Sequence, residues 1–345
     1  MRKSQEYMSL FLNLLTIGEK RVPVDLEKHV PKISLELANG ILDEYMQNNT
    51  FHSTVINVAP PVYVVGDLHG DLFDLLRILN RNGIPPISNY LFLGDYIDRG
   101  RFPIETILLV LSLHNQFPLN FQLLRGNHED PNVCEQYGFH EKLREMFGAN
   151  SLKLKFYTVF SYLPIAGIIE DKYFCVHGGI SRHLTSLSCL TSISLPITEI
   201  TPLIEDILWS DPSNTNDYYT SNPRGRGHQF GLPATDYFLQ RSKMQYIIRA
   251  HTYIPNGATL FHSAKVISIF SSSHYVEGGN VAIIVYVDGI HVYEKLYPES
   301  AMKKVSNSII QPGIEKKFSA TTFLPPLRKP HPQSVVQKSK TVYML

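Results

Sequence analysis

Short apolar runs along this sequence repeatedly end in side chains that can bind a metal ion. The runs 63–65, 91–93 and 121–124 are followed within four residues by Asp67, His69, Asp95, Asn127 and His128. Two later runs, 173–176 and 246–248, lead into His177 and His251. Oxygen and imidazole donors without thiolate suit Mn, Fe, Zn or Co rather than a closed structural zinc site. The pattern predicts a two-metal hydrolytic centre with a bridging carboxylate and terminal Asp, Asn and His ligands.

Two arginines and a His–Asp pair would complete such a centre for a phosphate ester. Guanidinium groups bind phosphoryl oxygens in a bidentate manner, and Arg99 and Arg224 each lie beside a glycine in this sequence. His128 is suited to protonate a leaving alkoxide, and a carboxylate such as Asp98 would hold its ring and raise its pKa. The predicted chemistry is therefore hydrolysis of a phosphate ester.

Taken singly, each motif also has an ordinary structural interpretation. The segment 66–70 could be a strand-to-helix turn with a capping Asp. A lone His177 or His251 is more often a hydrogen-bonded core histidine than a ligand. The recurrence of these groups in a fixed order, each after a separate apolar run, favours the metal centre.

The elements that must position these groups alternate between strands and helices in the first half of the chain. Apolar periodicity predicts helices at 8–15, 35–45, 72–79 and 103–113. Open α/β sheets place ligands at the carboxyl ends of their strands. The late runs 281–287 and 291–294 have no helix between them and are predicted to be antiparallel. The expected fold class is α/β, a sheet sandwich flanked by helices.

The chain divides into a predicted catalytic domain, residues 1–297, and a tail. Residues 1–50 form its helical N-terminal part, and 184–222 is expected to be surface loops around a short element at 204–209. Apolar periodicity fades beyond 297, and the segment 302–345 holds eight Lys or Arg residues against one Glu. We expect 298–345 to be a flexible, basic, Pro-containing tail.

Composition sets limits on partners and compartment. The 345 residues are 43% hydrophobic with a net charge of +1, which argues against a nucleic-acid binder held by bulk electrostatics. Three cysteines without C-x-x-C spacing indicate a reducing compartment. Glu6 and Asn13 interrupt what would otherwise resemble a signal peptide, and no apolar run approaches the roughly 20 residues that span a bilayer. The expected location is the cytoplasm, with the nucleus as a further possibility, and no membrane partner.

The full set of motifs resembles the phosphoprotein phosphatase family of Ser/Thr protein phosphatases. The motifs are GDLHG, GDYIDRG, RGNHE, HGG, WSDP, PRGRGHQFG and RAH, and the match covers roughly 35–296. Broader calcineurin-like phosphoesterases share the metal motifs but usually lack WSDP and the arginine pair. The resemblance implies the calcineurin-like metallophosphoesterase fold with a central β-sandwich, and the segment 222–231 looks more like the type 2A branch than the type 1 branch.

The resemblance also implies a role for each site residue. Asp67, His69 and Asp95 would hold one metal ion, and Asp95, Asn127, His177 and His251 the other, with Mn or an Fe/Zn pair as the ions. Arg99, Arg224 and Tyr275 would bind the phosphoryl group, and His128 with Asp98 would act as general acid. The family mechanism is direct attack by a hydroxide that bridges the metals, without a phosphoenzyme. Val133, Tyr137 and Trp209 match a substrate groove, although each could equally be packing.

Two segments depart from the family pattern. Where the family usually reads Ser-Ala-Pro-Asn-Tyr-Cys, residues 271–276 read Ser-Ser-Ser-His-Tyr-Val, which puts the loop shape and toxin sensitivity in doubt. At the C-terminus only Tyr343 and Leu345 correspond to the type 2A ending.

Three hypotheses follow from the sequence. The first is a phosphoserine/phosphothreonine protein phosphatase, acting on phosphoprotein substrates with regulatory subunits as partners. A phosphoesterase for nucleotides or small phosphate esters is the second, and a pseudophosphatase scaffold of low activity is the third. Intact ligands argue against the scaffold.

Overall fold

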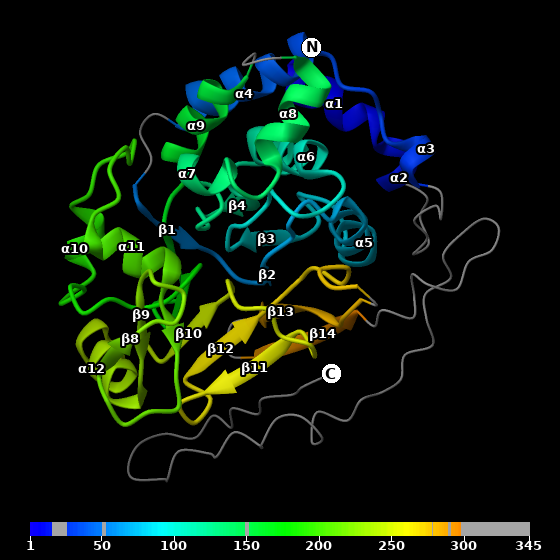
Figure 1. Cartoon of the computed structure of the whole chain (residues 1–345). Coiled ribbons are helices and arrows are strands. Elements are labelled where there is room, and N and C mark those ends of the chain that lie inside the picture. The colour runs from blue at the N-terminus through cyan, green and yellow to red at the C-terminus, as the bar shows by residue number, and fades with distance from the viewer. Residues whose placement is uncertain (16–25, 50–52, 149–151, 278, 289–290, 298–345) are drawn as a thin grey trace.

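The computed structural model describes residues 1–15, 26–49, 53–148, 152–277, 279–288 and 291–297, and two β-sheets form the centre of this part (Figure 1). The predicted tail, 298–345, lies outside the described residues. One sheet has six strands in the order β1 (Val55–Val58), β5 (Ala166–Ile169), β6 (Tyr173–Val176), β10 (Tyr246–Arg249), β12 (Val266–Ile269) and β11 (Ala258–Phe261). The other has five, in the order β14 (His291–Tyr297), β13 (Ala282–Asp288), β2 (Val62–Val65), β3 (Asn89–Phe92) and β4 (Phe121–Leu123).

The strands that precede the predicted ligands run parallel within each sheet. Val65 of β2 pairs with Phe92 of β3, which in turn pairs with Leu123 of β4. In the other sheet Arg249 of β10 pairs with Val176 of β6, so these carboxyl ends are also level. The late strands β13 and β14 are antiparallel, as predicted. The strands that precede the predicted ligands are therefore divided between two sheets, and the sandwich brings both sets of carboxyl ends together.

An apolar core between the sheets holds the sandwich together. Val62 and Val64 of β2 lie in this core with Leu91 of β3, whereas Val65 and Phe92 belong to the core on the other face of the same sheet. This alternation follows from the two-residue period of a strand. Because both faces are buried, the strands are almost continuously apolar, and this is why they stood out in the sequence.

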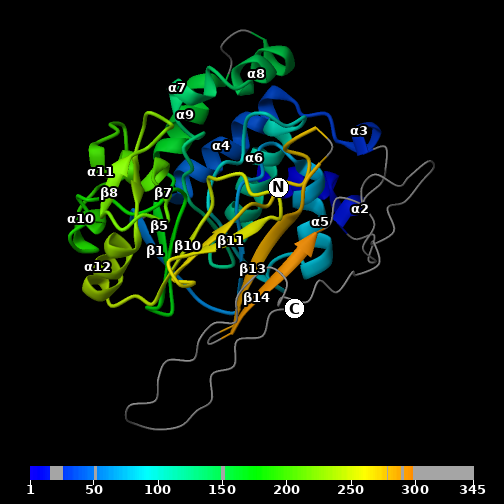
Figure 2. The ribbon, with the colours of Figure 1, turned by 60° about the horizontal axis from the view of Figure 1, so that its bottom comes forward.

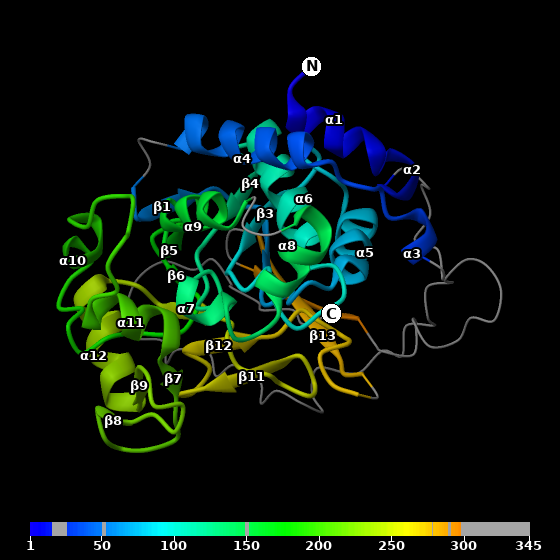
Figure 3. The ribbon, with the colours of Figure 1, turned by 45° about the horizontal axis from the view of Figure 1, so that its top comes forward.

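Helices cover the outer faces of both sheets (Figure 3). The β2–β4 side carries α1 (Lys3–Leu10), α2 (Leu12–Leu15), α3 (Leu26–His29), α4 (Leu35–Asn49), α5 (Leu72–Asn82), α6 (Pro103–Gln116), α7 (Pro131–Cys134), α8 (Phe139–Phe147) and α9 (Lys153–Ser161). The other side carries α10 (Ser188–Thr191), α11 (Pro202–Trp209) and α12 (Leu232–Ser242). Nearly all of α6 is buried, because α1 and α4 pack over it. The α/β fold class with a helix-flanked sandwich is confirmed.

The segment 184–222 has more regular structure than the sequence indicated. Besides the expected short element, now α11, it contains α10 and the strands β7 (Asp211–Pro212) and β8 (Tyr219–Ser221). These strands form a small sheet with β9 (His228–Phe230), in the order β7-β9-β8. Pairing with a strand that lies later in the chain gives no local periodic signal, so the loop prediction was wrong here.

The second view shows the late strands β13 and β14 beside α5 (Figure 2). Ile284 of β13 pairs with Val65 of β2, which places this hairpin next to the first ligand strand. Within the described residues, no helix is long and apolar enough to cross a membrane.

Candidate metal centre and phosphate site

Two glycines allow the loops after β3 and β4 to touch. Gly94 has a φ of 107°, and a Cβ placed on it would overlap the backbone of Gly126. A Cβ placed on Gly126 would in turn overlap the backbone nitrogen of Asp95. Only glycine is tolerated at such approaches, so Asp95 and Asn127, which follow these glycines, lie next to each other.

Glu129 ties the same two loops together. Its Oε2 accepts hydrogen bonds from the backbone N–H groups of Asp95 (2.8 Å) and Gly126 (2.9 Å), and its Oε1 accepts one from Tyr96 (2.9 Å). The side chain is fully buried, and this burial raises the pKa of Glu129 to about 7. The backbone around Asp95 is therefore held by a carboxylate that contacts three amides.

Asp67, His69 and Asp95 form the first group of predicted ligands. His69 Nε2 lies 3.7 Å from Asp67 Oδ2 and 3.6 Å from Asp95 Oδ2. The other ring nitrogen, Nδ1, lies 3.1 Å from the carbonyl oxygen of Ile97, which fixes the ring orientation. The structure thus turns Nε2 toward both carboxylates.

The second group comes from both sheets. Asn127 Oδ1 lies 2.8 Å from His177 Nε2 and 2.7 Å from His251 Nδ1. His177 Nε2 is also 3.4 Å from Asp95 Oδ1, and its Nδ1 lies 3.0 Å from the carbonyl oxygen of Leu93. Since Asp95 has one oxygen near each group, its position is the one that a bridging carboxylate would need.

The donor atoms in this centre fit metal ions. No group in the described part of the chain donates a hydrogen bond to the buried Asp67 Oδ2. Burial raises the pKa of Asp67 to about 7, and burial with Asp67 and Glu129 nearby raises the pKa of Asp95 well above its usual value. Burial lowers the pKa of His69, His177 and His251, which keeps these imidazoles neutral. Neutral imidazoles can ligate a cation, and a cation would compensate the buried carboxylates.

The backbone is strained at several of these positions. His69, Asp95, Asp98, Arg99 and His251 all have φ between 46° and 68°. Non-glycine residues in this left-handed region are uncommon and cluster at functional sites. Here each strained residue lies in a loop directly after a strand, where the backbone turns to direct the side chain into the centre.

His128 and Asp98 form a buried pair beside the predicted metal ligands. His128 Nδ1 lies 2.6 Å from Asp98 Oδ2, and the backbone N–H of His128 donates to Asp95 Oδ1 at 2.9 Å. Burial, with Arg99 and Arg224 nearby, lowers the pKa of His128, and burial raises the pKa of Asp98. The expected rise in the pKa of His128 was therefore wrong, because burial and the two arginines outweigh the effect of Asp98. Asp98 thus fixes the orientation of the His128 ring through Nδ1. The second ring nitrogen, Nε2, faces Asp95 Oδ2 at 3.9 Å.

Arg99 projects between two aromatic rings at the entrance to the centre. Its guanidinium carbon lies 4.5 Å from the ring centroid of Tyr137 and 5.4 Å from that of Tyr275. Tyr275 in turn stacks on His69, with 5.1 Å between the ring centroids. These cation–π contacts hold an exposed arginine in place, and its guanidinium faces the site where an anion would bind.

Arg224 is oriented by Asp211, a residue to which the sequence assigned no role. Arg224 Nε donates to Asp211 Oδ2 at 2.7 Å, and the buried Arg249 donates from Nη2 to Asp211 Oδ1 at 3.0 Å. Arg249 Nε also donates to the carbonyl oxygen of Gly178, beside His177. Asp211 and Arg249 thus join the Arg224 loop to the strand ends that carry His177 and His251.

The predicted groove residues differ in their exposure. Tyr137 is 40% exposed, whereas Val133 is only 4% exposed within α7. Trp209 is half-buried, meets His251 edge to face at 5.5 Å, and has the guanidinium of Arg226 4.6 Å above its ring. Tyr137 and Trp209 thus flank the centre, while Val133 packs inside.

The altered loop 271–276 is anchored to α5. Asp74 accepts hydrogen bonds from the backbone N–H of Ser273 at 2.5 Å and from its hydroxyl at 3.2 Å. Asn280 donates from Nδ2 to the carbonyl oxygen of Ser272 at 2.7 Å. These bonds place Tyr275 over His69, although its neighbours differ from the family pattern.

Sequence reasoning missed three supporting residues, namely Glu129, Asp211 and Arg249. Each belongs to a motif that was recognised, RGNHE, WSDP or RAH, but none was given a role. Their position inside those motifs was the available signal. What they do depends on tertiary contacts between distant loops.

Comparisons with known proteins agree with this geometry. Residues 60–255 match the calcineurin-like phosphoesterase family. The serine/threonine-protein phosphatase PP1-delta of Caenorhabditis elegans is 39% identical over 224 residues, which cover 65% of this chain and 73% of that protein. A second serine/threonine-protein phosphatase of the same worm is 36% identical over 256 residues, 72% of this chain and 56% of its own length.

Solved structures show the same relationship. A protein serine/threonine phosphatase from Saccharomyces cerevisiae, with similarity to human phosphatase PP5, aligns with a TM-score of 0.76 and 26% identity, covering 85% of this chain and 95% of that one. A cold-active protein tyrosine phosphatase shares the fold at 17% identity, with a TM-score of 0.56 over 78% of this chain and 82% of that one. The chain therefore belongs to the calcineurin-like phosphoesterases and, among them, to the phosphoprotein phosphatase family of Ser/Thr protein phosphatases, whose centre is a dinuclear metal site.

Proposed function

We propose that this chain hydrolyses phosphoserine and phosphothreonine esters in proteins, with the residues above in the roles predicted for them. The observation that carries the proposal is the convergence of donors from both sheets on Asp95, whose two oxygens face His69 and His177. A general-acid pair and two arginines border the same point. The relatives named as Ser/Thr phosphatases support the substrate class.

Asp67, His69 and Asp95 would hold one ion, and Asp95, Asn127, His177 and His251 the other. When bound, two such ions would lower the pKa of a shared water and neutralise charge on the phosphoryl oxygens. The mixture of carboxylate, amide and imidazole donors favours Mn, or an Fe/Zn pair.

The chain's own residues account for binding and protonation. Arg99 and Arg224 approach from opposite loops, so their guanidinium groups can hold the equatorial phosphoryl oxygens. Tyr275, stacked on His69, closes one side of the site. His128 would protonate the serine or threonine oxygen as it leaves, while Asp98 keeps the ring oriented through Nδ1.

Hydrolysis of a phosphopeptide with added Mn tests the function directly. We expect turnover by the wild-type protein and none by Asp95→Asn, which removes one charge from the residue placed between the two ligand groups. Mononucleotides serve as the comparison substrate. Faster cleavage of a nucleotide than of any phosphopeptide would overturn the substrate assignment, and inactivity of the metal-loaded wild type toward all substrates would overturn the enzyme itself.

Metal content separates the proposed roles. His251→Ala should lose bound metal and activity together, whereas His128→Ala should lose turnover and keep its metal. Arg224→Ala should weaken inhibition by inorganic phosphate. Equal metal loss in both histidine variants would contradict the division between ligand and acid.

The natural partners are phosphoproteins, and regulatory subunits would select among them. The three cysteines are free thiols, with Cys134 and Cys175 buried, which supports a reducing compartment such as the cytoplasm or the nucleus. Affinity purification of the full chain from cells, followed by identification of the bound proteins, tests which phosphoproteins and which regulatory subunits bind it.

A further inference from the structure

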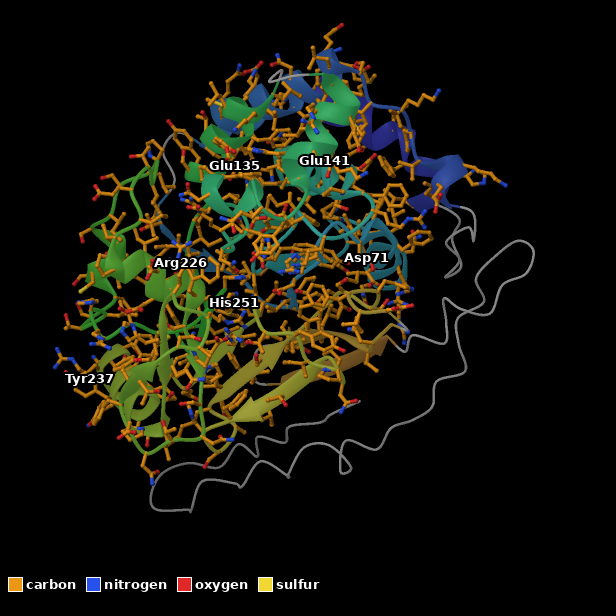
Figure 4. All side chains as sticks on the ribbon, viewed as in Figure 1. Asp71, Glu135, Glu141, Arg226, Tyr237 and His251 are labelled. Carbon is orange, nitrogen blue, oxygen red and sulfur yellow. The ribbon has the colours of Figure 1, made fainter. Side chains whose placement is uncertain are left out.

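A pocket of about 310 Å³ opens beside the proposed catalytic centre. Its inner end is lined by His69, Arg99 and Tyr275, which also border the phosphate site. The pocket extends toward the start of α5, where Asp71 lies, and Figure 4 shows Asp71 on the α5 side of His251, with Arg226 on the opposite side. A substrate whose phosphoryl group meets Arg99 would therefore have a neighbouring residue at this pocket.

The outer part of the pocket combines an apolar wall with positive charge. Phe73, Phe102 and Arg101 line this part of the pocket, and the ring centroids of the two phenylalanines lie 6.4 Å apart. With Arg99 at the inner end, two guanidinium groups border one small pocket. A ligand side chain with an apolar stem and an anionic end matches this lining.

The negative charge in the lining is already paired. Among the described residues that line the pocket, Asp71 is the one carboxylate. Its Oδ2 lies 3.3 Å from His274 Nδ1, and its Oδ1 accepts the backbone N–H of Asp74 at 2.9 Å. The hydrogen bond to Asp71 raises the pKa of His274, which adds positive character. His274 is also one of the departures from the family pattern.

Arg101 has an exchangeable partner. It forms an ion pair with Glu27 of α3, and both side chains are largely exposed, 70% and 50%. Exposed ion pairs are weak because water screens them and ordering two long side chains has an entropic cost. Glu27 thus competes with an anion in the pocket for the guanidinium of Arg101, and this weak pair can be exchanged.

We propose that this pocket, bounded by Phe73, Arg101, Phe102 and His274, is a subsite for an anionic side chain that flanks the phosphorylated residue of the substrate. The anion is a carboxylate or a second phosphoryl group, since both present oxygens to a guanidinium fork. This inference rests on the proposed phosphatase function and assigns its substrate preference.

A phosphopeptide series tests the subsite. Each of the three positions on either side of the phosphoserine is set in turn to Glu, phosphoserine, Gln or Lys. We expect an anion at one position to raise kcat/KM about tenfold over Gln, mainly through KM, as for one charge-assisted hydrogen bond. A gain from both anions identifies a general anion site, and a gain from phosphoserine alone identifies a second phosphoryl group.

Variants connect the preference to the pocket. Arg101→Gln should reduce the ratio of acidic to neutral peptide to about one, and Glu27→Gln should increase it by removing the competing carboxylate. Lys265→Gln, which breaks a comparable exposed pair with Asp236 far from the pocket, should leave the ratio unchanged. The subsite is refuted if no flanking position discriminates, or if the preference survives Arg101→Gln. Failure to hydrolyse any peptide in the series would instead refute the proposed function.

Discussion

Replacing Glu129 by Gln tests whether metal binding depends on a residue outside the proposed ligand set. The wild-type carboxylate accepts three backbone N–H groups, two at Oε2 and one at Oε1. A glutamine can keep its oxygen at the Oε2 position and retain two of these bonds. Its NH₂ group would then face the N–H of Tyr96, so that one charge-assisted bond is lost and two donors oppose each other.

The size of the effect follows from that geometry. Loss of one hydrogen bond to a charged acceptor costs about 1.5–3 kcal/mol. Residues that orient metal ligands typically change metal affinity by about 10–100-fold, which corresponds to about 1.4–2.8 kcal/mol. The cost of the lost hydrogen bond and the free energy that corresponds to this change in metal affinity are therefore similar. We therefore expect Glu129→Gln to raise the Kd for Mn by about 10–100-fold.

Calorimetric titration of metal-depleted protein with Mn measures this change. Glu105→Gln is the matched control, because Glu105 is also a buried carboxylate, 8% exposed, but lies on α6. The control should bind Mn like the wild type, and circular dichroism confirms that both variants are folded. A Kd for Glu129→Gln within about twofold of the wild type, well inside the expected range, would refute the argument that Glu129 positions Asp95.

Three other substitutions test separate parts of the structure. Asp98→Asn should lower kcat by about 10²-fold or more at unchanged metal content, because His128 loses its charged partner; an unchanged kcat would contradict this. Asp211→Asn should destabilise the fold by about 3–5 kcal/mol, measured by urea unfolding, since Arg249 is fully buried. A decrease in the free energy of unfolding below about 1 kcal/mol, the range of exposed ion pairs, would show that the other hydrogen bonds of Arg249 compensate for the loss of Asp211. Phe92→Ala should cost about 3–5 kcal/mol in the same assay, because its ring packs 4.8 Å from Phe121; a cost under about 1 kcal/mol would rule out that packing role.

The fold class could be predicted because its strongest signals are local. A run such as 62–65 is buried on both faces, so it is apolar throughout, and the glycine and aspartate after it end the strand within two residues. The helices α5 and α6 follow the two aspartate loops and show clear start signals, Asp71 as N-cap and Pro103 in the first turn. Each strand–loop–helix unit could therefore be recognised without knowledge of its neighbours.

The assignment of strands to sheets could not be predicted in the same way. Strand β1 pairs with β5 across more than a hundred residues, and β2 is joined on one side by the late strand β13. The small sheet that supports the Arg224 loop depends on β7 pairing with β9. Nothing in the periodicity of either segment specifies the partner, because strand pairing is decided by packing of the whole chain.

The supporting residues, such as Glu129, could not be recognised from the sequence because their contacts are also distant along the chain. Glu129 follows His128 in the sequence, yet its partners include Asp95 and Tyr96, more than thirty residues earlier. The residue types of metal ligands suggest their chemistry directly, whereas a residue that orients them can only be recognised from its contacts.

The hydrogen bonds between the two sheets explain why one centre needs both. The backbone N–H of His251 donates to Asp67 Oδ1 at 2.9 Å, and His177 Nδ1 lies 3.0 Å from the carbonyl oxygen of Leu93, so each sheet orients a proposed ligand of the other. Asp67 and Asp95 are buried carboxylates whose raised pKa values show the free-energy cost of that burial. Cations bound there would remove this cost in the folded state alone, because an unfolded chain does not bring the ligands together. Metal ions bound at this centre would therefore stabilise the association of the two sheets in addition to their proposed role in hydrolysis.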